Sequence, residues 1–273
     1  MGKDLIEKML GQLPKMKWPH GKQATELGRK SYDAALDRVD MYTGDPKVLG
    51  EALRILQTGD SLPFAYAGVA YTLIAASREK DGSYAEEGLE AALDWLEQAQ
   101  EAAIDIVDIN MIEALVYIYN GRYEDARLVL DYLHEQDPNN YYVHVGELIF
   151  WQAHNEVEEA AHWFEKAGLS AREVPQRLRL LSRMGEFYMQ QDVYDKALQV
   201  YKEALHFNKE KPELWHSLAV IYWRMEDYEE SARANKQSLK LGNLPAAQKL
   251  AEALKEKQGG SGILGRFKWG MGS

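Results

Sequence analysis

Cysteine is absent from this chain of 273 residues, which excludes disulfide bonds, thiolate metal sites and cysteine nucleophiles. Long apolar runs are absent too. The longest one, Phe64 to Ala76, has 13 residues, whereas a membrane-spanning helix needs about 20. Proline is scarce, with 8 residues that stand mostly near the edges of expected helices, and β-branched residues are sparse. These features favour helix throughout the chain.

Net positive charge is confined to the two ends of the chain. The net charge is −11, but residues 1–22 carry +3 and residues 259–273 carry +2, so that the body between them carries −16. Because phosphate neutralisation is the main source of affinity for nucleic acid, we expect no nucleic-acid partner. Charged residues interrupt Leu5–Leu13 and no small-residue cleavage site follows, so that we expect a cytoplasmic protein.

A repeat with a period of about 34 residues runs through the second half of the chain. Four units align once a three-residue insertion is placed near Pro175: residues 107–140, 141–174, 178–211 and 212–245. In the third of these units, apolar or small residues at helical spacing define one face of each of two helices: Leu181, Met184, Gly185 and Tyr188, then Tyr194, Ala197, Tyr201 and Ala204. Each helix is apolar on one side only, so that a single unit cannot bury its own face and must stack on its neighbours.

The repeat resembles the tetratricopeptide repeat family, whose pattern is Trp–x2–Leu–Gly–x2–Tyr, then Ala–x3–Phe, then Pro. The last unit reproduces its first part as Trp215-x2-Leu218-Ala219-x2-Tyr222. Three positions where apolar or small residues are usual are polar here: Glu147, Asn235 and Ser238. The resemblance implies an all-α fold, a right-handed α-solenoid of helix-turn-helix repeats with a C-terminal capping helix. It also implies a protein-binding molecule without catalytic function or cofactor.

We expect three parts along the chain. Residues 1–21 form a basic, amphiphilic N-terminal segment. Residues 22–258 form the solenoid of five to six repeats, clearest over 107–245, with a capping helix over 246–258. Residues 259–273 form a Gly-rich linker and an apolar, basic tail.

In this family the first helix of each repeat lines a concave groove, where partners usually lie. The repeat phase assigns nine candidate partner-binding residues to this groove: Tyr71, Leu115, Tyr119, Tyr142, Arg179, Arg183, Gln190, Trp223 and Arg224. They are apolar and aromatic upstream and cationic downstream, so that we expect a partner segment with an apolar anchor and a carboxylate or acidic stretch. The alternative is that these residues only pack against adjacent helices, or that the N-terminal helix fills the groove.

The sequence therefore predicts a protein-protein interaction scaffold or adaptor that binds a protein or peptide partner, as in an assembly factor. The alternative is a structural subunit of a larger or self-assembled complex. In that case the tail would dock into a neighbouring copy or onto a membrane surface.

The tail carries four large apolar side chains and two cations over seven residues: Ile263, Leu264, Arg266, Phe267, Lys268 and Trp269. Burying such side chains contributes roughly 1.5–3 kcal/mol each as an upper figure, enough for a docking motif. Three roles stay open: docking to a partner or to a neighbouring copy, contact with a membrane surface helped by the N-terminal segment, and a disordered tail without a docking role.

Catalytic and metal-binding patterns are missing from the sequence. It has neither a Gly-rich phosphate loop followed by a Walker lysine nor a nucleophile-elbow serine. His154, Glu158 and His162 have the spacing of ligands on one helix, but the repeat phase places a turn at Asn155 between them. We therefore expect neither an enzyme nor a metal site.

Overall fold

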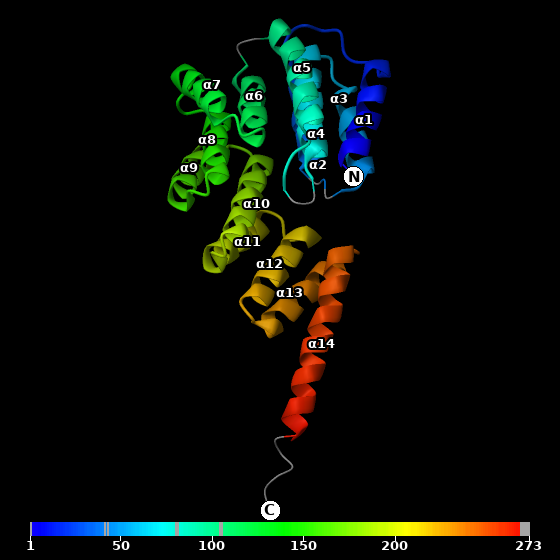
Figure 1. Ribbon diagram of the computed structural model, residues 1–273, viewed down its shortest axis with the longest axis vertical. Helices are drawn as coiled ribbons and strands as arrows, with labels where there is room; N and C mark the ends of the chain where they lie inside the picture. Colours follow the sequence, from blue (N-terminus) through cyan, green and yellow to red (C-terminus); the bar gives the residue numbers. More distant parts are fainter. Residues whose placement is uncertain (1, 41, 43, 80–81, 104–105, 268–273) are drawn as a thin grey trace, which may run out of the picture. The chain divides into compact units, whose positions relative to one another are not determined.

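The computed structural model describes residues 2–40, 42, 44–79, 82–103 and 106–267 (Figure 1). Every regular element within these residues is a helix, apart from two isolated bridges between single residue pairs. The chain forms two compact units, unit 1 (Met1–Ala171) and unit 2 (Arg172–Ser273). None of the described helices is both long and apolar enough to cross a membrane.

Within its described residues, unit 1 contains nine α-helices and one short 3-10 helix. Their bounds are α1 Gly2–Gln12, the 3-10 helix Leu13–Lys15, α2 Glu26–Val39, α3 Pro46–Leu56, α4 Leu62–Ser77, α5 Glu86–Ala102, α6 Val107–Tyr119, α7 Tyr123–Gln136, α8 Tyr141–Ala153 and α9 Val157–Ser170. Helices α2 to α9 pack as four consecutive antiparallel pairs, and the first helices α2, α4, α6 and α8 pack on one another in succession.

Unit 2 contains two further pairs and a terminal helix. Their bounds are α10 Val174–Gln190, α11 Tyr194–Phe207, α12 Pro212–Arg224, α13 Tyr228–Leu241 and α14 Pro245–Phe267. Pair α10/α11 packs on pair α12/α13, and α14 covers the exposed side of α12 and α13. The expected all-α solenoid of helix-turn-helix repeats is confirmed.

The turn inside each of the four clear repeats has the same backbone conformation. Gly121, Asn155, Asp192 and Glu226 all have positive φ, between 57° and 71°. They stand 34, 37 and 34 residues apart, which are the offsets of the sequence repeat with its insertion near Pro175. Glycine adopts this region without strain, and Asn and Asp tolerate it, so that Glu226 is the one strained residue among these four.

The N-terminal segment is part of unit 1, which corrects the expectation of a separate part over residues 1–21. Helix α1 packs on α4 and α5, and Ile6 (1% exposed), Met9 and Leu13 (0%) are core residues. Trp18 lies edge-on to Tyr66 and Trp95, with ring centroids 6.4 and 5.8 Å away. The apolar stripe of this segment is already buried, so that it does not offer a membrane-binding face.

Helix α14 is longer than the expected capping helix 246–258. It continues to Phe267 and so runs through Gly259–Gly262, where the sequence predicts a linker. Glycine costs about 1 kcal/mol per residue inside a helix. Adding residues to an existing helix avoids the larger cost of starting a new one, so that α14 continues through these glycines. The side chains of Ile263, Leu264, Arg266 and Phe267, and the whole of Lys268 and Trp269, lie outside the described residues.

Two of the polar departures from the repeat pattern hold the last helices of unit 2 together. Asn235 Nδ2 donates to the carbonyl of Ala247 on α14, at 2.8 Å, and Ser238 Oγ donates to the carbonyl of Pro212, also at 2.8 Å. Both side chains are buried, and a buried polar group is tolerated only where it is hydrogen-bonded. They therefore fix α13 to α12 and α14.

His216 on α12 makes the stability of unit 2 dependent on pH. Burial lowers the pKa of His216 below its usual 6.5, an effect that Asn235 partly offsets. Because the unfolded chain then binds the proton more readily, stability is present above pH 6.5 and is lost as pH falls from there towards the folded-state pKa. We expect His216→Gln to reduce the loss of stability between about pH 7.5 and about pH 5.5, as measured by urea unfolding. An equal loss in both proteins would contradict this role.

Candidate protein-binding surface

Arg29 brings together three first helices of unit 1. Its guanidinium lies over the ring of Phe64 on α4, 5.3 Å from the centroid, and over the ring of Tyr142 on α8, 5.5 Å from the centroid. Its Nε lies 3.5 Å from a carboxylate oxygen of Asp33, one turn further along α2. The side chains of Arg29 and Asp33 each keep about a third of their surface exposed. A cation held over aromatic faces and still reachable from solvent is typical of binding surfaces.

Carboxylates flank this cluster along α2. Arg29, Asp33 and Asp37 follow one another at steps of four and Asp40 comes three residues later, so that they share one helical face. The hydroxyl of Tyr71 on α4 donates to Asp40 Oδ1 at 2.9 Å. We call Arg29, Phe64, Tyr71, Tyr142 and these carboxylates the first-helix surface of unit 1. It combines aromatic rings with predominantly negative charge.

The candidate residues of unit 1 fall into two classes. Tyr71, Tyr119 and Tyr142 are half-buried, with part of each ring exposed, and Tyr119 stacks on Tyr84 at 4.3 Å between centroids. Leu115, in contrast, is 1% exposed, which corrects its assignment to the open surface. The reason is that α6 is apolar nearly all round and is surrounded by α4, α5, α7 and α8.

The candidate residues of unit 2 all lie on its first helices, α10 and α12. Arg179 and Arg183 are half-buried and one turn apart on α10, whereas Gln190 and Arg224 are exposed at the last positions of α10 and α12. Trp223 is half-buried and lies edge-on to Tyr228, with centroids 5.1 Å apart. All five residues therefore belong to a surface of unit 2.

Sequence reasoning missed Arg29 and the α2 carboxylates because the first repeat matches the family pattern poorly. The spacing Arg29-x3-Asp33-x3-Asp37 on an expected helix was the available signal. It also missed a shallow hollow on the other side of unit 1, between α7 and α8.

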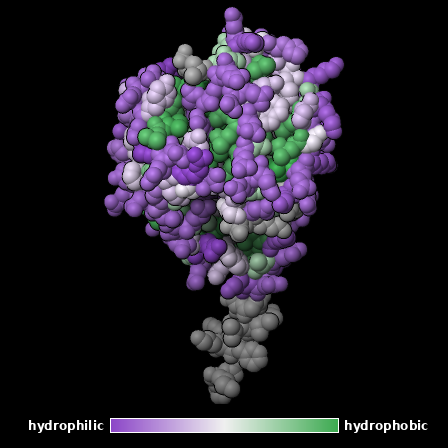
Figure 2. All heavy atoms as spheres, turned by 45° about the horizontal axis from the view of Figure 1, so that its top comes forward, coloured by the Kyte–Doolittle hydropathy of each residue, from purple (hydrophilic) through white to green (hydrophobic). Residues whose placement is uncertain are grey.

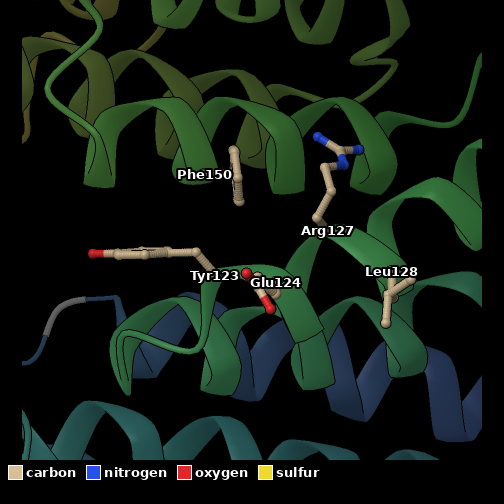
Figure 3. A pocket seen from close by; sticks show the side chains of 5 residues that line it. All are labelled: Tyr123, Glu124, Arg127, Leu128 and Phe150. Atoms are coloured by element: carbon tan, nitrogen blue, oxygen red, sulfur yellow. The ribbon is translucent and has the colours of Figure 1, made fainter.

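The hollow has a volume of about 480 Å³ and is lined by Tyr123, Glu124, Arg127 and Leu128 from α7 and by Phe150 from α8 (Figure 3). The Tyr123 and Phe150 rings meet edge-on, with centroids 6.2 Å apart. The guanidinium of Arg127 reaches up to α8, where it lies 5.2 Å from the Phe150 centroid. Leu128 is 69% exposed and Tyr132, one turn further on, is also exposed. Elsewhere the face shown in Figure 2 has small apolar patches separated by hydrophilic residues.

Comparisons with known proteins agree with this fold. A family model described as TPR repeat matches residues 185–226. Among solved structures, PilF of Pseudomonas aeruginosa superimposes with a TM-score of 0.53 at 15% identity, over 77% of this chain and 93% of that one. A chain of the APC/C Cut9–Hcn1 hetero-tetramer superimposes with a TM-score of 0.54 at 15% identity, over 83% of this chain and 46% of that one. No curated protein matches the chain by sequence.

Proposed function

We propose that this chain, a tetratricopeptide-repeat protein, is a non-catalytic scaffold or adaptor that binds a segment of a partner protein along its first helices. The observation that carries the proposal is the Arg29 cluster, in which Arg29 and Tyr142 form a partly exposed site over the buried ring of Phe64, so that three repeats meet there. Tyrosine and arginine are among the residues that dominate the binding energy of protein interfaces, and Arg29, Tyr71 and Tyr142 are the half-buried residues of this surface. One structural neighbour, from the Cut9–Hcn1 hetero-tetramer, is itself found in a protein assembly.

The two units favour different parts of a partner segment. The aromatic rings of unit 1 suit an apolar anchor, while Asp33, Asp37 and Asp40 repel acidic residues there. Arg179 and Arg183 on unit 2 suit a carboxylate or an acidic stretch. The partner we propose therefore has an apolar part that contacts unit 1 and an acidic part that contacts unit 2, and the chain would act on it as a cytoplasmic assembly factor.

The test is affinity capture of partners from the native host with matched variants. We expect Tyr142→Ala to reduce capture of the partner about tenfold, because one half-buried aromatic contact contributes on the order of 1.5 kcal/mol. Arg179→Glu/Arg183→Glu should abolish capture by reversing the local charge. Leu169→Ala, at an exposed leucine on α9, is the control and should leave capture unchanged.

Folding of each variant is checked by urea unfolding before capture is compared. If the partner is retained by both surface variants, or lost equally with Leu169→Ala, the first helices are not the binding surface and the proposal fails.

Self-assembly is a second candidate function, favoured by the exposed apolar residues of α7 around the hollow. It does not depend on the first-helix surface, because α7 is the second helix of its repeat.

A further inference from the structure

The outward face of α7 is unusually apolar for a solvated helix. Three of its large side chains are exposed: Tyr123, Leu128 and Tyr132. Tyr123 and Leu128 also line the hollow, whose floor is the ring of Phe150. A concave site with exposed apolar rims is a site at which a partner side chain could be buried on two sides.

Negative charge predominates at this site. Glu124 lines the hollow and Glu135 lies further along α7, whereas Asp125 is paired with Arg122 at 2.7 Å. The cation inside the hollow, Arg127, is already held by Glu147 and by Asp131, at 2.8 Å from Asp131. The hollow therefore suits a ligand that is apolar and positively charged.

The tail of this chain has that composition. Residues 263–269 supply the apolar Ile263, Leu264, Phe267 and Trp269 together with Arg266 and Lys268. Cations can lie over the exposed ring of Tyr123, as Arg127 lies over Phe150. The tail carries two cations, whereas α7 of another copy has more carboxylates than cations, so that short-range attraction opposes the repulsion between two chains of net charge −11.

Helix α14 extends beyond the helix on which it packs. It has 23 residues, against 14 in α13. At 1.5 Å per residue, α14 is about 13 Å longer than α13. Figure 1 shows its second half extending beyond α12 and α13. The C-terminal end of this helix, from which the tail continues, therefore lies clear of the other helices of unit 2.

We propose that the C-terminal tail of a second copy docks into the hollow between α7 and α8, with Phe267 or Trp269 against Phe150 and Leu128, and Arg266 and Lys268 near the α7 carboxylates. Tail and hollow are different surfaces, so that the contact is head-to-tail and builds dimers and longer chains as concentration rises.

The experiment is light scattering after size-exclusion chromatography of the full chain over a range of micromolar concentrations. Leu128→Lys removes an exposed apolar contact and repels the cationic tail, and we expect it to raise the dissociation constant about tenfold or more. Phe267→Glu/Trp269→Glu should also raise the dissociation constant, because it replaces two apolar side chains of the tail with acidic ones. The matched control is Leu169→Lys on α9, because Leu169 is 88% exposed and lies outside the lining of the hollow.

Mixing the two defective variants gives the sharpest result. The Leu128→Lys protein keeps its tail and the Phe267→Glu/Trp269→Glu protein keeps its hollow. Each variant alone should associate about tenfold more weakly than the wild-type chain, whereas their mixture should form a heterodimer with the affinity of the wild-type contact. The proposal is overturned if the wild-type chain stays monomeric at every concentration, if Leu169→Lys weakens association as much as Leu128→Lys, or if the mixture stays monomeric. Partner capture through the first helices is measured separately, so that either proposal can fail without the other.

Discussion

Replacing Arg127 by methionine should lower the free energy of unfolding of unit 1 by about 3 kcal/mol. Both terminal guanidinium nitrogens of Arg127 donate to the carboxylate of Glu147, with Nη1 to Oε2 at 2.9 Å. Glu147 is 3% exposed, so that the variant leaves a buried carboxylate without its counter-charge. The hydrogen bonds that Arg127 donates to Glu147 also raise the pKa of Arg127 above its usual value, which agrees with a strong pair. Arg127 itself remains about one-third exposed, which places the expected loss at the lower end of the range for buried pairs.

Urea unfolding of the variants distinguishes a lost attraction from an unpaired buried charge. Arg127→Met/Glu147→Met should recover most of the stability, because a buried ion pair replaced by apolar residues of similar size is often neutral. Asp131→Asn is the control: Asp131 is largely exposed, and an exposed ion pair contributes about 0.2–1 kcal/mol. A double variant as unstable as Arg127→Met would show that packing of the Arg127 stem, rather than charge, carries the effect.

Replacing Leu13 by alanine should destabilise unit 1 by about 2–5 kcal/mol. Leu13 is fully buried at the end of the N-terminal segment, and its carbonyl accepts a hydrogen bond from Trp18 Nε1 at 3.2 Å. Truncation leaves a cavity among the side chains that α1 packs against on α4 and α5, which adds to the lost apolar burial. The measurement is urea unfolding followed by tryptophan fluorescence, since Trp18 and Trp95 report on this packing.

Leu10→Ala supplies the control for the N-terminal segment, because Leu10 is only partly buried. It should cost clearly less than Leu13→Ala. Equal and small effects of the two substitutions would mean that the segment detaches without loss of the fold. Its apolar stripe would then again be available for a membrane or a partner.

The sequence by itself determined the repeat and its boundaries. Leu181, Gly185, Tyr188 and Ala197 recur by residue class because each pair of helices must close on its neighbour. Gly185 shows how strict this is: a Cβ there would lie 2.5 Å from the ring of Tyr201. The period also fixed the turns, whose left-handed residues fall at one repeat phase. Local spacing suffices here because contacts within a solenoid are mostly between neighbours in sequence.

Tertiary structure decided which apolar residues face solvent and which charges are paired. Leu115 and Tyr142 both belong to the expected groove face of a first helix, yet Leu115 is enclosed by four helices whereas Tyr142 stays partly open under Arg29. Glu147 departs from the apolar pattern of the repeat because it pairs with Arg127, 20 residues earlier in the sequence, and only the structure brings the two together. The first 21 residues looked like a free amphiphilic segment, but α4 and α5 bury their apolar stripe. Periodicity gives the phase of a residue on its own helix, and burial depends on every helix that packs around it.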